Sequence, residues 1–528
     1  MKSNRDQQTM LVKINAGAVQ GVNSIPITIE VNVAGTIVGQ KISYYFVGLP
    51  DNAIREGYQR IEAAIGSMGR KMPRQKIVVN MAPANIRKEG SAYDLPIAVG
   101  ILASSGQVLS DRISDFVIMG ELALDGNIRP VRGALPIAIM AREKNLKGII
   151  LPAKNAREAA IVSGIEVYGV NHLREVFDFL QGGGTLEPVR VNAREEFSIK
   201  KNAYAADFKD VKGQENIKRA LQLAAAGGHN VLLIGPPGAG KTMLAKRLPT
   251  ILPPLGLHEA LETTKIHSVA GLLDEHASLI TTRPFRSPHH TISDAALVGG
   301  GSNPLPGEIS LAHNGVLFLD ELPEFKRSVL EVLRQPLEER KITISRARMT
   351  VDYPASFILV ASMNPCPCGY LNHPEKECVC NAGAVQRYLN KISGPLLDRI
   401  DIHVEVTPVS FDEMVSAPST DQGSAQISKE VVRAREVQKN RLLPLGMKIS
   451  VNAEMPSRLV KEICQIKEEG RSLLRVAMEK LQLSARAYDR ILKVARTAAD
   501  LDGEPEIQLN HLAEAIQYRS LDRGNWGA

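Results

Sequence analysis

The sequence predicts an α/β protein of three parts, in which two α/β domains are followed by a helical one. Residues 1–185 and 206–408 alternate short, β-rich apolar runs with amphipathic runs of helical spacing, which is typical of mixed α/β domains. Residues 428–528 consist almost entirely of helical patterns. The polar, glycine-bearing residues 186–205 predict a linker, and residues 409–427, which are poor in large apolar side chains, predict a loop.

The composition is that of an ordinary globular protein, large enough for several cores. The chain has 528 residues, of which 44% are hydrophobic and 23% are charged. It has no stretch of about 18 consecutive apolar residues, and its first residues lack the apolar segment and cleavage site of a secretory leader. We therefore expect a cytoplasmic protein without a membrane segment. Its net charge of +7 is compatible with a polyanionic partner but does not establish one.

A phosphate-binding loop is the most specific motif in the chain. The segment HNVLLIGPPGAGKTMLAKRL places an apolar run before a glycine-rich turn and a helical pattern after it, a context that disfavours an ordinary Gly-Pro turn. Glycines let backbone N–H groups close around phosphate oxygens at a helix N-terminus. Lys241 would neutralise the β- and γ-phosphates, and Thr242 would offer its hydroxyl to Mg²⁺. The residues expected to bind the nucleotide are Gly235, Pro236, Pro237, Gly238, Ala239, Gly240, Lys241 and Thr242.

Two adjacent acids follow a second apolar run, in the segment GVLFLDELPEF. A buried strand that ends in such a pair places one carboxylate over a metal ion and the second beside the attacking water. Asp320 is therefore the expected magnesium ligand, together with Thr242, and Glu321 is the expected base. Two acids after an apolar run are also common at solvated strand ends, but a position downstream of the phosphate loop favours the catalytic interpretation.

Three further polar residues follow in an order that suggests catalytic roles. Asn364 ends the apolar run SFILVASMN, where its amide could orient the lytic water. Arg399 lies in ISGPLLDRIDIHVEV, where a guanidinium could stabilise transition-state charge in a neighbouring site. Arg486 falls in the first turn of a helical pattern that starts after Ser484. Taken singly, the three residues have ordinary alternatives, as a turn residue, a helix-end ion pair and a solvated charge.

The phosphate loop, LFLDE, MN, LLDRID and a late helical arginine, in this order, resemble an AAA+ ATPase of the magnesium-chelatase-like group, and more closely the bacterial YifB/ComM family. The resemblance covers essentially the whole chain. It implies an N-terminal domain with a Lon-protease-like, S5-type α/β fold, a P-loop AAA+ core built on a parallel sheet, and an all-helical C-terminal lid. It also implies a hexameric ring of identical subunits that binds ATP and Mg²⁺ between subunits.

The same resemblance assigns roles to individual residues. Arg399 would be the arginine finger that a subunit donates to its neighbour, and Arg486 would be the sensor of the lid. The segment Asp210–Leu221 lies where such ATPases contact the adenine. The residues that act on their own subunit's nucleotide would be those of the phosphate loop together with Asp320, Glu321 and Asn364.

The N-terminal domain lacks the catalytic pair of a Lon-type protease. Its segments RKEGSAYD and GELALDGNIRPVRGALPIAIMAREKNLKGIILP resemble the two that carry the Ser-Lys pair. Carried across without gaps, the nucleophile position falls on Ala92, one place after Ser91, and the lysine position falls on Leu135. Because a Ser-Lys mechanism needs a hydroxyl and an amine within hydrogen-bond reach, we expect no protease activity. We interpret this domain as a scaffold or as a module for an unknown protein partner.

The segment ERKITISRARMTVDYPAS predicts a β-hairpin with a basic tip. Ile342 and Ile344 alternate with polar residues, and the alternation resumes at Met349 after a turn flanked by Arg346 and Arg348. This hairpin resembles the pre-sensor hairpin of related ring helicases, which tracks a nucleic-acid backbone in the pore. Arg346 and Arg348 are therefore the expected phosphate contacts. The alternative is a solvated hairpin whose arginines protect an edge strand from aggregation.

A second insertion, RPFRSPHHTISDAALVGGGSNPLPGE, is rich in glycine and proline, and we expect it to form a mobile loop at the pore or at an interface. It carries Arg283, Arg286, His289 and His290. Adjacent histidines are a poor zinc pair, so we assign no metal to them.

Four of the five cysteines cluster in the segment NPCPCGYLNHPEKECVC. An odd number of cysteines in a chain without a leader argues against a disulfide framework. The two C-x-C pairs predict a tetrahedral thiolate site in an insertion at 366–380, with zinc as the expected structural ion and His373 as a substitute ligand. An iron–sulfur cluster and unmetallated thiols stay open as alternatives. The predicted ligands are Cys366, Cys368, Cys378 and Cys380, whereas Cys464 is predicted to be a buried core residue.

We therefore expect an enzyme, an ATP-hydrolysing ring motor that acts on single-stranded or branched DNA. By family resemblance it would be a branch-migration helicase that promotes recombination of incoming DNA during natural transformation. Two alternatives stay open. The first is the ATPase motor subunit of a metal-chelatase complex, which the lack of a DxSxS metal motif disfavours. The second is a non-catalytic, ATP-gated binding module, which the intact acid pair disfavours. An ATP-dependent protease is disfavoured by Leu135.

Overall fold

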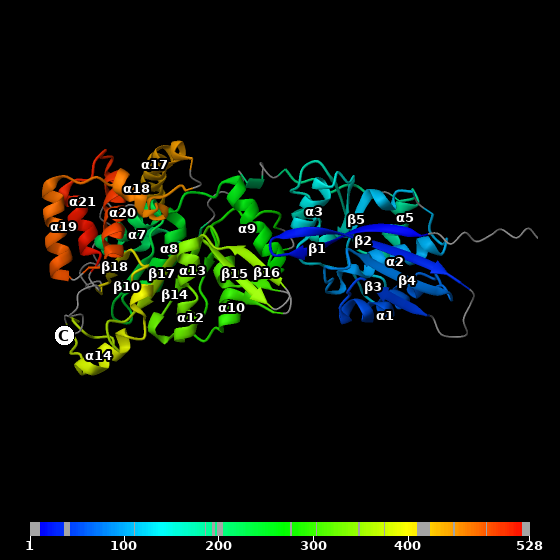
Figure 1. Cartoon of the computed structure of the whole chain (residues 1–528), viewed down its shortest axis with the longest axis horizontal. Coiled ribbons are helices and arrows are strands. Elements are labelled where there is room, and N and C mark those ends of the chain that lie inside the picture. Colours follow the sequence, from blue (N-terminus) through cyan, green and yellow to red (C-terminus); the bar gives the residue numbers. More distant parts are fainter. Residues whose placement is uncertain are drawn as a thin grey trace, which may run out of the picture. The chain divides into compact units, whose positions relative to one another are not determined.

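The computed structural model separates the chain into two compact units, neither of which is contiguous in sequence (Figure 1). The N-terminal unit comprises Met1–Lys200, Leu257–Ile280 and Gly301–Pro306, and the C-terminal unit comprises Lys201–Gly256, Thr281–Gly300 and Gly307–Ala528. The structure describes residues 11–35, 43–109, 111–184, 186–192, 196–197, 204–274, 277–301, 304–346, 349–373, 375–408, 423–446, 449–481 and 483–519.

A seven-stranded sheet forms the centre of the N-terminal unit. Its strands, and two short ones beside it, are β1 (Val12–Gln20), β2 (Asn23–Ala34), β3 (Tyr44–Val47), β4 (Lys76–Ala82), β5 (Phe116–Ile118), β6 (Glu121–Leu122), β7 (Ile128–Arg129), β8 (Gly148–Pro152) and β9 (Glu166–Val170). The order in the sheet is β3-β4-β2-β1-β5-β8-β9. β1, β2 and β4 pair antiparallel, and the other neighbours pair in parallel. The helices are α1 (Asn52–Ser67), α2 (Asp94–Ser104), α3 (Ala134–Glu143), α4 (Ala153–Ala159), α5 (Leu173–Leu180) and α9 (Leu257–Ala270).

Helices α2 and α3 pack on opposite faces of this sheet. Gly100 of α2 lies against Ile14 of β1, and Ile137 of α3 lies against Gly17 of the same strand. Because side chains alternate along a strand, residues three apart point to opposite faces. The centre of the sheet is therefore covered on both sides, and most of β1 is buried.

The C-terminal unit is built on a second sheet and a basic hairpin. The sheet strands are β10 (Val231–Ile234), β11 (Phe285–Arg286), β14 (Val316–Leu319), β17 (Ile358–Met363) and β18 (Ile402–Glu405). The hairpin consists of β15 (Lys341–Arg346) and β16 (Met349–Pro354). Two short strands are β12 (Gly299–Gly300), in this unit, and β13 (Leu305–Pro306), in the N-terminal unit. The helices before the C-terminal helical region are α7 (Glu215–Gly227), α8 (Lys241–Ile251), α10 (Asp294–Val298), α11 (Glu308–Leu311), α12 (Arg327–Glu331), α13 (Arg334–Glu339), α14 (Ala382–Leu389) and α15 (Gly394–Leu397).

The second sheet is parallel throughout and has the order β11-β14-β17-β10-β18. β10, β14 and β17 are buried along their whole length, as expected for a parallel sheet covered on both faces. β17 lies between the strand that precedes the phosphate loop and the strand that precedes the acid pair. Because ligands of such sheets bind outside the carboxyl ends of the strands, this order collects the predicted catalytic residues at one edge.

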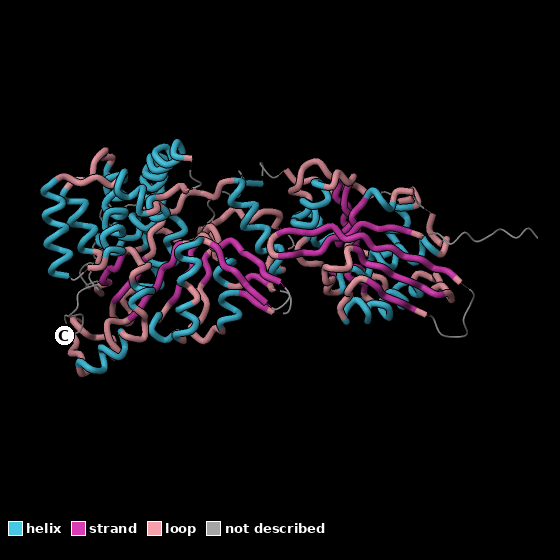
Figure 2. The backbone as a smooth tube through the Cα atoms, viewed as in Figure 1, coloured by secondary structure: helices cyan, strands magenta, loops and turns pink. Residues whose placement is uncertain are grey.

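The C-terminal region is helical, as Figure 2 shows for the described residues. It consists of α17 (Ser424–Leu442), α18 (Ser457–Ile463), α19 (Glu468–Leu481), α20 (Ala485–Asp502) and α21 (Leu509–Gln517). Buried polar contacts join it to the amino ends of the strands. His229, just before β10, contacts Asp401 at 3.2 Å and Thr497 of α20 at 2.8 Å. Asp401, just before β18, also accepts a hydrogen bond from Arg490 of α20.

The architecture confirms the predicted α/β class with a parallel central sheet and a helical C-terminal region. The prediction that the second insertion is one mobile loop is wrong, because it contributes β11, the edge strand of the sheet. Phe285 of β11 stacks on Phe318 at 5.9 Å, Arg283 is buried, and Arg286 pairs with Glu308 at 2.6 Å. None of the described helices combines the length and the apolar character that a membrane crossing requires.

Candidate active site

The phosphate loop joins β10 to α8. Gly235 approaches its neighbour so closely that a β-carbon there would lie 2.3 Å from the carbonyl oxygen of Val406. Gly240, which precedes the first residue of α8, has a φ of 86°, in the left-handed region that favours glycine. The loop leads into the N-terminus of α8, where free N–H groups and the helix dipole favour a phosphate. The fold therefore requires glycine at both positions and forms an anion site there.

Lys241 is held over this loop by neutral acceptors. Its Nζ donates hydrogen bonds to the carbonyl oxygens of Gly235 at 2.6 Å and Pro236 at 2.9 Å, and to Oδ1 of Asn364 at 3.1 Å. Burial lowers the pKa of its ammonium, and the nearby acid pair opposes that effect. Because the acceptors carry no charge, the ammonium is available to neutralise a phosphate.

The threonine and aspartate expected to hold Mg²⁺ are in direct contact. Oγ1 of Thr242 donates a hydrogen bond to Oδ2 of Asp320 at 2.8 Å. The other carboxylate oxygen of Asp320 accepts hydrogen bonds from the hydroxyl of Ser362 and from the backbone N–H of Glu321, the latter at 3.1 Å. Hydroxyl and carboxylate oxygens are the ligands that Mg²⁺ prefers. These residues therefore fit a magnesium ion bound together with nucleotide phosphates.

Glu321 has an unusual backbone conformation and an exposed side chain. Its φ of 54° lies in the left-handed region, which a residue other than glycine adopts at a cost and often at functional sites. Its side chain is 59% exposed, and its Oε2 lies 3.5 Å from Nδ1 of His290. Glu321 also lines a cavity of about 450 Å³, together with Asn364 and Tyr388. A carboxylate and an amide thus share one cavity beside the phosphate loop.

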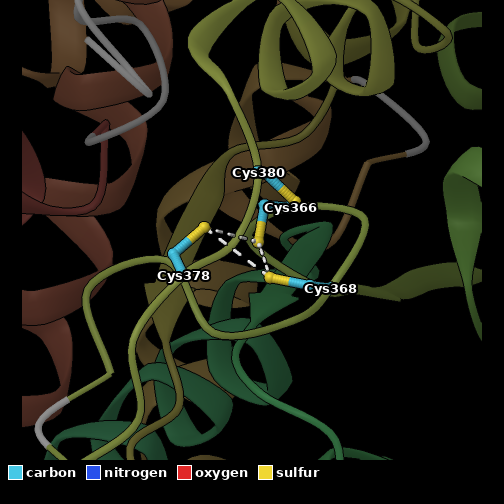
Figure 3. A group of neighbouring side chains, drawn as sticks. All are labelled: Cys366, Cys368, Cys378 and Cys380. Carbon is cyan, nitrogen blue, oxygen red and sulfur yellow. Dashed lines mark hydrogen bonds between the residues drawn. The ribbon is translucent and has the colours of Figure 1, made fainter.

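The four clustered cysteines converge on one point (Figure 3). The Sγ atom of Cys366 lies 3.3 Å from that of Cys368 and 3.7 Å from that of Cys378, and the last two are 3.6 Å apart. With Cys380 included, all four Sγ atoms lie within 4.8 Å of one another. A tetrahedron built on Zn–S bonds of about 2.3 Å has edges of about 3.8 Å. The donor set and its spacing therefore fit a zinc ion.

The cysteine cluster adjoins the phosphate loop. It begins two residues after Asn364, and a β-carbon on Gly369 would lie only 2.7 Å from Cδ of Pro237. Burial raises the pKa of the Cys368 thiol, but hydrogen bonds from the backbone of Tyr370 and Val379 and from the thiols of Cys366 and Cys380 together lower it to about 6. Because the thiolate is the form that binds metals, these donors favour the ligand form of Cys368.

The predicted arginine finger and lid sensor do not join this site within one chain. Arg399 precedes β18, at the amino edge of the sheet, and its guanidinium lies 2.6 Å from Glu338 of α13. Arg486 is exposed in the first turn of α20, one turn before Arg490, which pairs with Asp401 at the same edge. The phosphate loop lies at the opposite, carboxyl edge.

The predicted basic hairpin is confirmed by its register. β15 and β16 pair antiparallel from Lys341 opposite Pro354 to Arg346 opposite Met349. Arg346 is exposed, and its Nη2 would lie 3.1 Å from a β-carbon on Gly300. Arg348, the second predicted phosphate contact, lies outside the described residues.

The positions that correspond to a Lon-type catalytic pair form no such pair. Ala92 occupies the nucleophile position, and its carbonyl oxygen accepts the N–H of Gly120 at 2.8 Å. Ser91 donates a hydrogen bond from its hydroxyl to the carboxylate of Glu121. Leu135, at the lysine position, is fully buried in α3. The serine is thus adjacent to an acid and not to an amine.

Sequence reasoning missed three residues of the site. Ser362 supports Asp320 from within an apolar strand, and His290 reaches Glu321 from the second insertion. Gln214, in the segment expected to contact adenine, donates from Nε2 to the carbonyl oxygens of Ala239 at 3.2 Å and Thr407 at 2.9 Å. Of the three, only Gln214 lies in a segment that the sequence singled out, because it precedes a helical pattern upstream of the phosphate loop.

Three family models match the chain in succession. Residues 29–155 match the model described as subunit ChlI of Mg-chelatase, residues 207–414 match magnesium chelatase, subunit ChlI, and residues 421–519 match the C-terminal part of that subunit.

Curated relatives match over nearly the whole length. The YifB protein of Salmonella typhimurium is 43% identical over 513 residues, which cover 97% of this chain and 98% of the relative. The competence protein ComM of Haemophilus influenzae is 43% identical over 515 residues, with the same coverage. Lon protease 2 of Bacillus subtilis is 31% identical over 154 residues, which cover 26% of each chain.

We predict that Ser362→Ala raises the concentration of Mg²⁺ that ATP hydrolysis requires. Loss of the hydroxyl leaves one oxygen of Asp320 without its side-chain donor, and removing such a supporting partner typically costs about 10- to 100-fold in metal affinity or activity. The Mg²⁺ concentration at half-maximal hydrolysis should therefore rise about tenfold or more. Ser345→Ala, on the exposed face of β15, is the matched control. An Mg²⁺ titration of Ser362→Ala that overlays the wild-type curve contradicts the role given to this hydroxyl.

Proposed function

Because the chain belongs to the YifB/ComM family of magnesium-chelatase-like AAA+ ATPases, we propose that it is an ATP-driven hexameric ring motor that acts on single-stranded or branched DNA. Its work would be branch migration during recombination of incoming DNA in natural transformation. The carrying observation is the convergence of Lys241, Thr242, Asp320 and Asn364 at one edge of the parallel sheet, in a chain that also carries a hairpin with the exposed Arg346. The relative from Haemophilus influenzae is named a competence protein, and that name supports a DNA-related role.

The geometry supports a separate role for each of these residues in ATP hydrolysis. The phosphate loop and Lys241 bind and neutralise the triphosphate, while Thr242 and Asp320 hold Mg²⁺. When bound, Mg²⁺ supplies charge neutralisation on the β- and γ-phosphate oxygens. Glu321 accepts a proton from the attacking water, and the amide of Asn364 orients that water in the shared cavity. Ser362 keeps Asp320 directed at Thr242.

The positions of Arg399 and Arg486 support action on a neighbouring subunit. Arg399 lies at the amino edge of the sheet, Arg490, one turn after Arg486, pairs with Asp401 at that edge, and a four-residue strand is about 13 Å long. Neither guanidinium therefore has a direct approach to the phosphate loop of its own chain. A head-to-tail ring joins different surfaces of successive subunits, and in this proposal the amino edge of one subunit faces the nucleotide site of the next. Arg399 would then leave Glu338 and stabilise the charge of the neighbour's γ-phosphate.

The hairpin supplies the contact to DNA in this proposal. Arg346 is exposed at its described end, and Arg348 follows two residues later in the sequence. Its lower part is held by local contacts, since Lys341 pairs with Asp352 at 3.1 Å and Thr343 donates to the same carboxylate at 2.6 Å. A stem held by these contacts, with the cationic Arg346 at its described end, would fit the repeating phosphates of a single strand.

We further propose that the four cysteines bind one structural zinc ion. The ion would fix the loop between Cys366 and Cys380, which leads from Asn364 to α14. Because Gly369 in this loop packs on Pro237, the ion would also support the phosphate loop. The N-terminal unit, with Leu135 at the position of a lysine, serves in this proposal as a scaffold or a partner-binding module and not as a protease.

We predict that DNA stimulates ATP hydrolysis and that Arg346→Ala with Arg348→Ala removes the stimulation. Hydrolysis should be measured with single-stranded, duplex and branched DNA at several salt concentrations. Two lost phosphate contacts should reduce the slope of log affinity for a single strand against log salt by about 1.4. Arg458→Ala with Arg471→Ala removes the same charge from exposed positions of the helical region and is the matched control. The Lys241→Ala variant gives the background rate that is measured when the protein does not hydrolyse ATP. If DNA neither binds to the protein nor stimulates its ATP hydrolysis at low salt, the DNA proposal is wrong.

We predict that two inactive variants restore activity when they are mixed. Arg399→Ala subunits keep their phosphate loop and lose the finger, whereas Lys241→Ala subunits keep the finger. In randomly mixed rings at equal concentration, about one quarter of the sites would combine an intact loop with a neighbour's finger. The measured rate should therefore recover to about a quarter of the wild-type value. If Arg399 is only the partner of Glu338 in a structural ion pair, the mixture stays inactive.

We predict about one zinc ion per chain in the purified protein, measured by elemental analysis. Cys366→Ser and Cys378→Ser should each lose most of it, because a structural zinc site needs four ligands. Cys464→Ser, at a buried cysteine of the helical region, should keep it. Iron and visible absorbance in an anaerobic preparation would indicate an iron–sulfur cluster and not zinc. A purified chain free of both metals would contradict the metal proposal.

A further inference from the structure

The sheet of the N-terminal unit has one face open to solvent over the neighbouring strands β3, β4 and β2 (Figure 1). Burial alternates along these strands: every second residue of β4 is buried, and so is every second residue of β2 from Ile27 to Val33. α2 covers the buried face, where its Gly100 lies against Val31. On the opposite face α3 packs at the other end of β1, near Gly17. Such alternation is typical of a sheet with one solvated face.

Two large apolar side chains of β3 lie on this solvated face. Tyr45 and Val47 are each 52% exposed. The alternate residues of the strand pack inwards: the ring of Tyr44 lies 4.7 Å from that of Phe46 and 4.9 Å from that of Tyr58 in α1, measured between centroids. Because successive side chains of a strand point to opposite faces, Tyr45 and Val47 point to solvent. A solvated face usually carries polar residues at such positions, so this exposed aromatic ring calls for a ligand.

Three exposed cations accompany the exposed ring. Lys76, the first residue of β4, places its Nζ 5.0 Å from the centroid of the Tyr45 ring. Lys71 and Arg74 are exposed in the segment that leads from α1 into β4. Within the part of the chain that the structure describes, none of the three cations forms an ion pair. Their charge is therefore available to an anionic ligand.

The strands beside these cations carry almost no negative charge. β1, β2, β3 and β4 contain one acidic residue, Glu30. Its carboxylate is already paired, because it lies 3.4 Å from Nζ of Lys13 and accepts a hydrogen bond from Nδ2 of Asn80 at 2.9 Å. The electrostatic balance of this face is therefore positive, and it complements a polyanion.

We propose that Tyr45, Lys71, Arg74 and Lys76 form a second binding site for single-stranded DNA, the open-face site. A base stacks on the ring of Tyr45, and the three cations contact phosphates on either side of that base. Proteins that bind single strands combine an aromatic ring for the bases with cations for the backbone, and a double helix does not offer the faces of its bases. The inference rests on the proposed function for its choice of DNA as the polyanion. It assigns a ligand to the N-terminal unit, which the hairpin does not belong to.

The first test measures the affinity of the full chain for a fluorescently labelled oligodeoxythymidylate at several salt concentrations. All variants carry alanine at both hairpin arginines, so that the hairpin does not contribute. We expect the triple variant Lys71→Ala, Arg74→Ala and Lys76→Ala to reduce the slope of log affinity against log salt by about 2, because each phosphate contact to a single strand contributes about 0.7. The matched control removes the same charge from exposed positions at the end of α3 and just after it, and should keep the slope: Arg142→Ala, Lys144→Ala and Lys147→Ala.

The second test examines stacking on Tyr45 in the same background. Tyr45→Ala should weaken the affinity for the oligodeoxythymidylate about fivefold or more, and Tyr45→Phe, which keeps the ring, should restore most of it. A direct reading comes from Tyr45→Trp combined with Trp526→Phe, because Trp526 is the only tryptophan of the chain. A stacked base should quench the fluorescence of the new indole. Thermal unfolding of each variant checks that it is folded.

Three results would overturn the open-face site. The first is a chain with alanine at both hairpin arginines that does not bind the oligodeoxythymidylate at low salt. The second is a slope that changes equally in the triple variant and in its matched control. The third is an indole at position 45 whose fluorescence stays unchanged at saturating oligonucleotide.

Stimulation of ATP hydrolysis separates this inference from the proposed function. If DNA stimulates hydrolysis by the wild-type chain and the open-face variants bind it with unchanged affinity and slope, the motor function stands and the open-face site is wrong. If the open-face variants lose affinity but DNA does not stimulate hydrolysis by the wild-type chain, the open-face site stands and the motor function is wrong.

Discussion

The position of β17 between β10 and β14 is the constraint on which the nucleotide site depends. The phosphate loop and the acid pair follow strands that are not neighbours, and the strand between them fixes the spacing at which Thr242 reaches Asp320. Ser362 of β17 holds Asp320, and Asn364, the residue directly after β17, accepts a hydrogen bond from Lys241. Because all three strands are parallel, their polar ends share one edge of the sheet.

The parts of the site that could be predicted are those in which chemistry follows directly from neighbours in sequence. Lys241, Thr242 and the acid pair each end an apolar run or begin a helix, and this context is visible without a structure. Ser362 has no such signal, because a serine in a buried strand is indistinguishable from a packing residue until its partner is known. The sequence equally gives no sign of the ion pair between Arg399 and Glu338, because this pair depends on how α13 packs against the end of β18.

The fold was predictable to a similar extent. The alternation of β-rich and helical patterns in the sequence was enough to predict the two α/β regions and the helical C-terminal region. They could not predict that β11, a two-residue strand within a proline- and glycine-rich insertion, completes the sheet, because its pairing with β14 comes from long-range packing. They also could not predict that Leu257–Ile280 belongs to the N-terminal unit, because a chain can leave and re-enter a domain without a change in composition.

The polar contacts at the amino end of β10 have a mechanical consequence. His229 ties that end to Thr497 of the helical region, while five residues later the strand ends and the phosphate loop begins. A strand is nearly inextensible along its axis, because its backbone is already close to full extension. β10 is therefore a stiff connection about 13 Å long between the helices at one end and the phosphate loop at the other. A displacement of the loop along the strand axis would reach α20 with little loss to stretching.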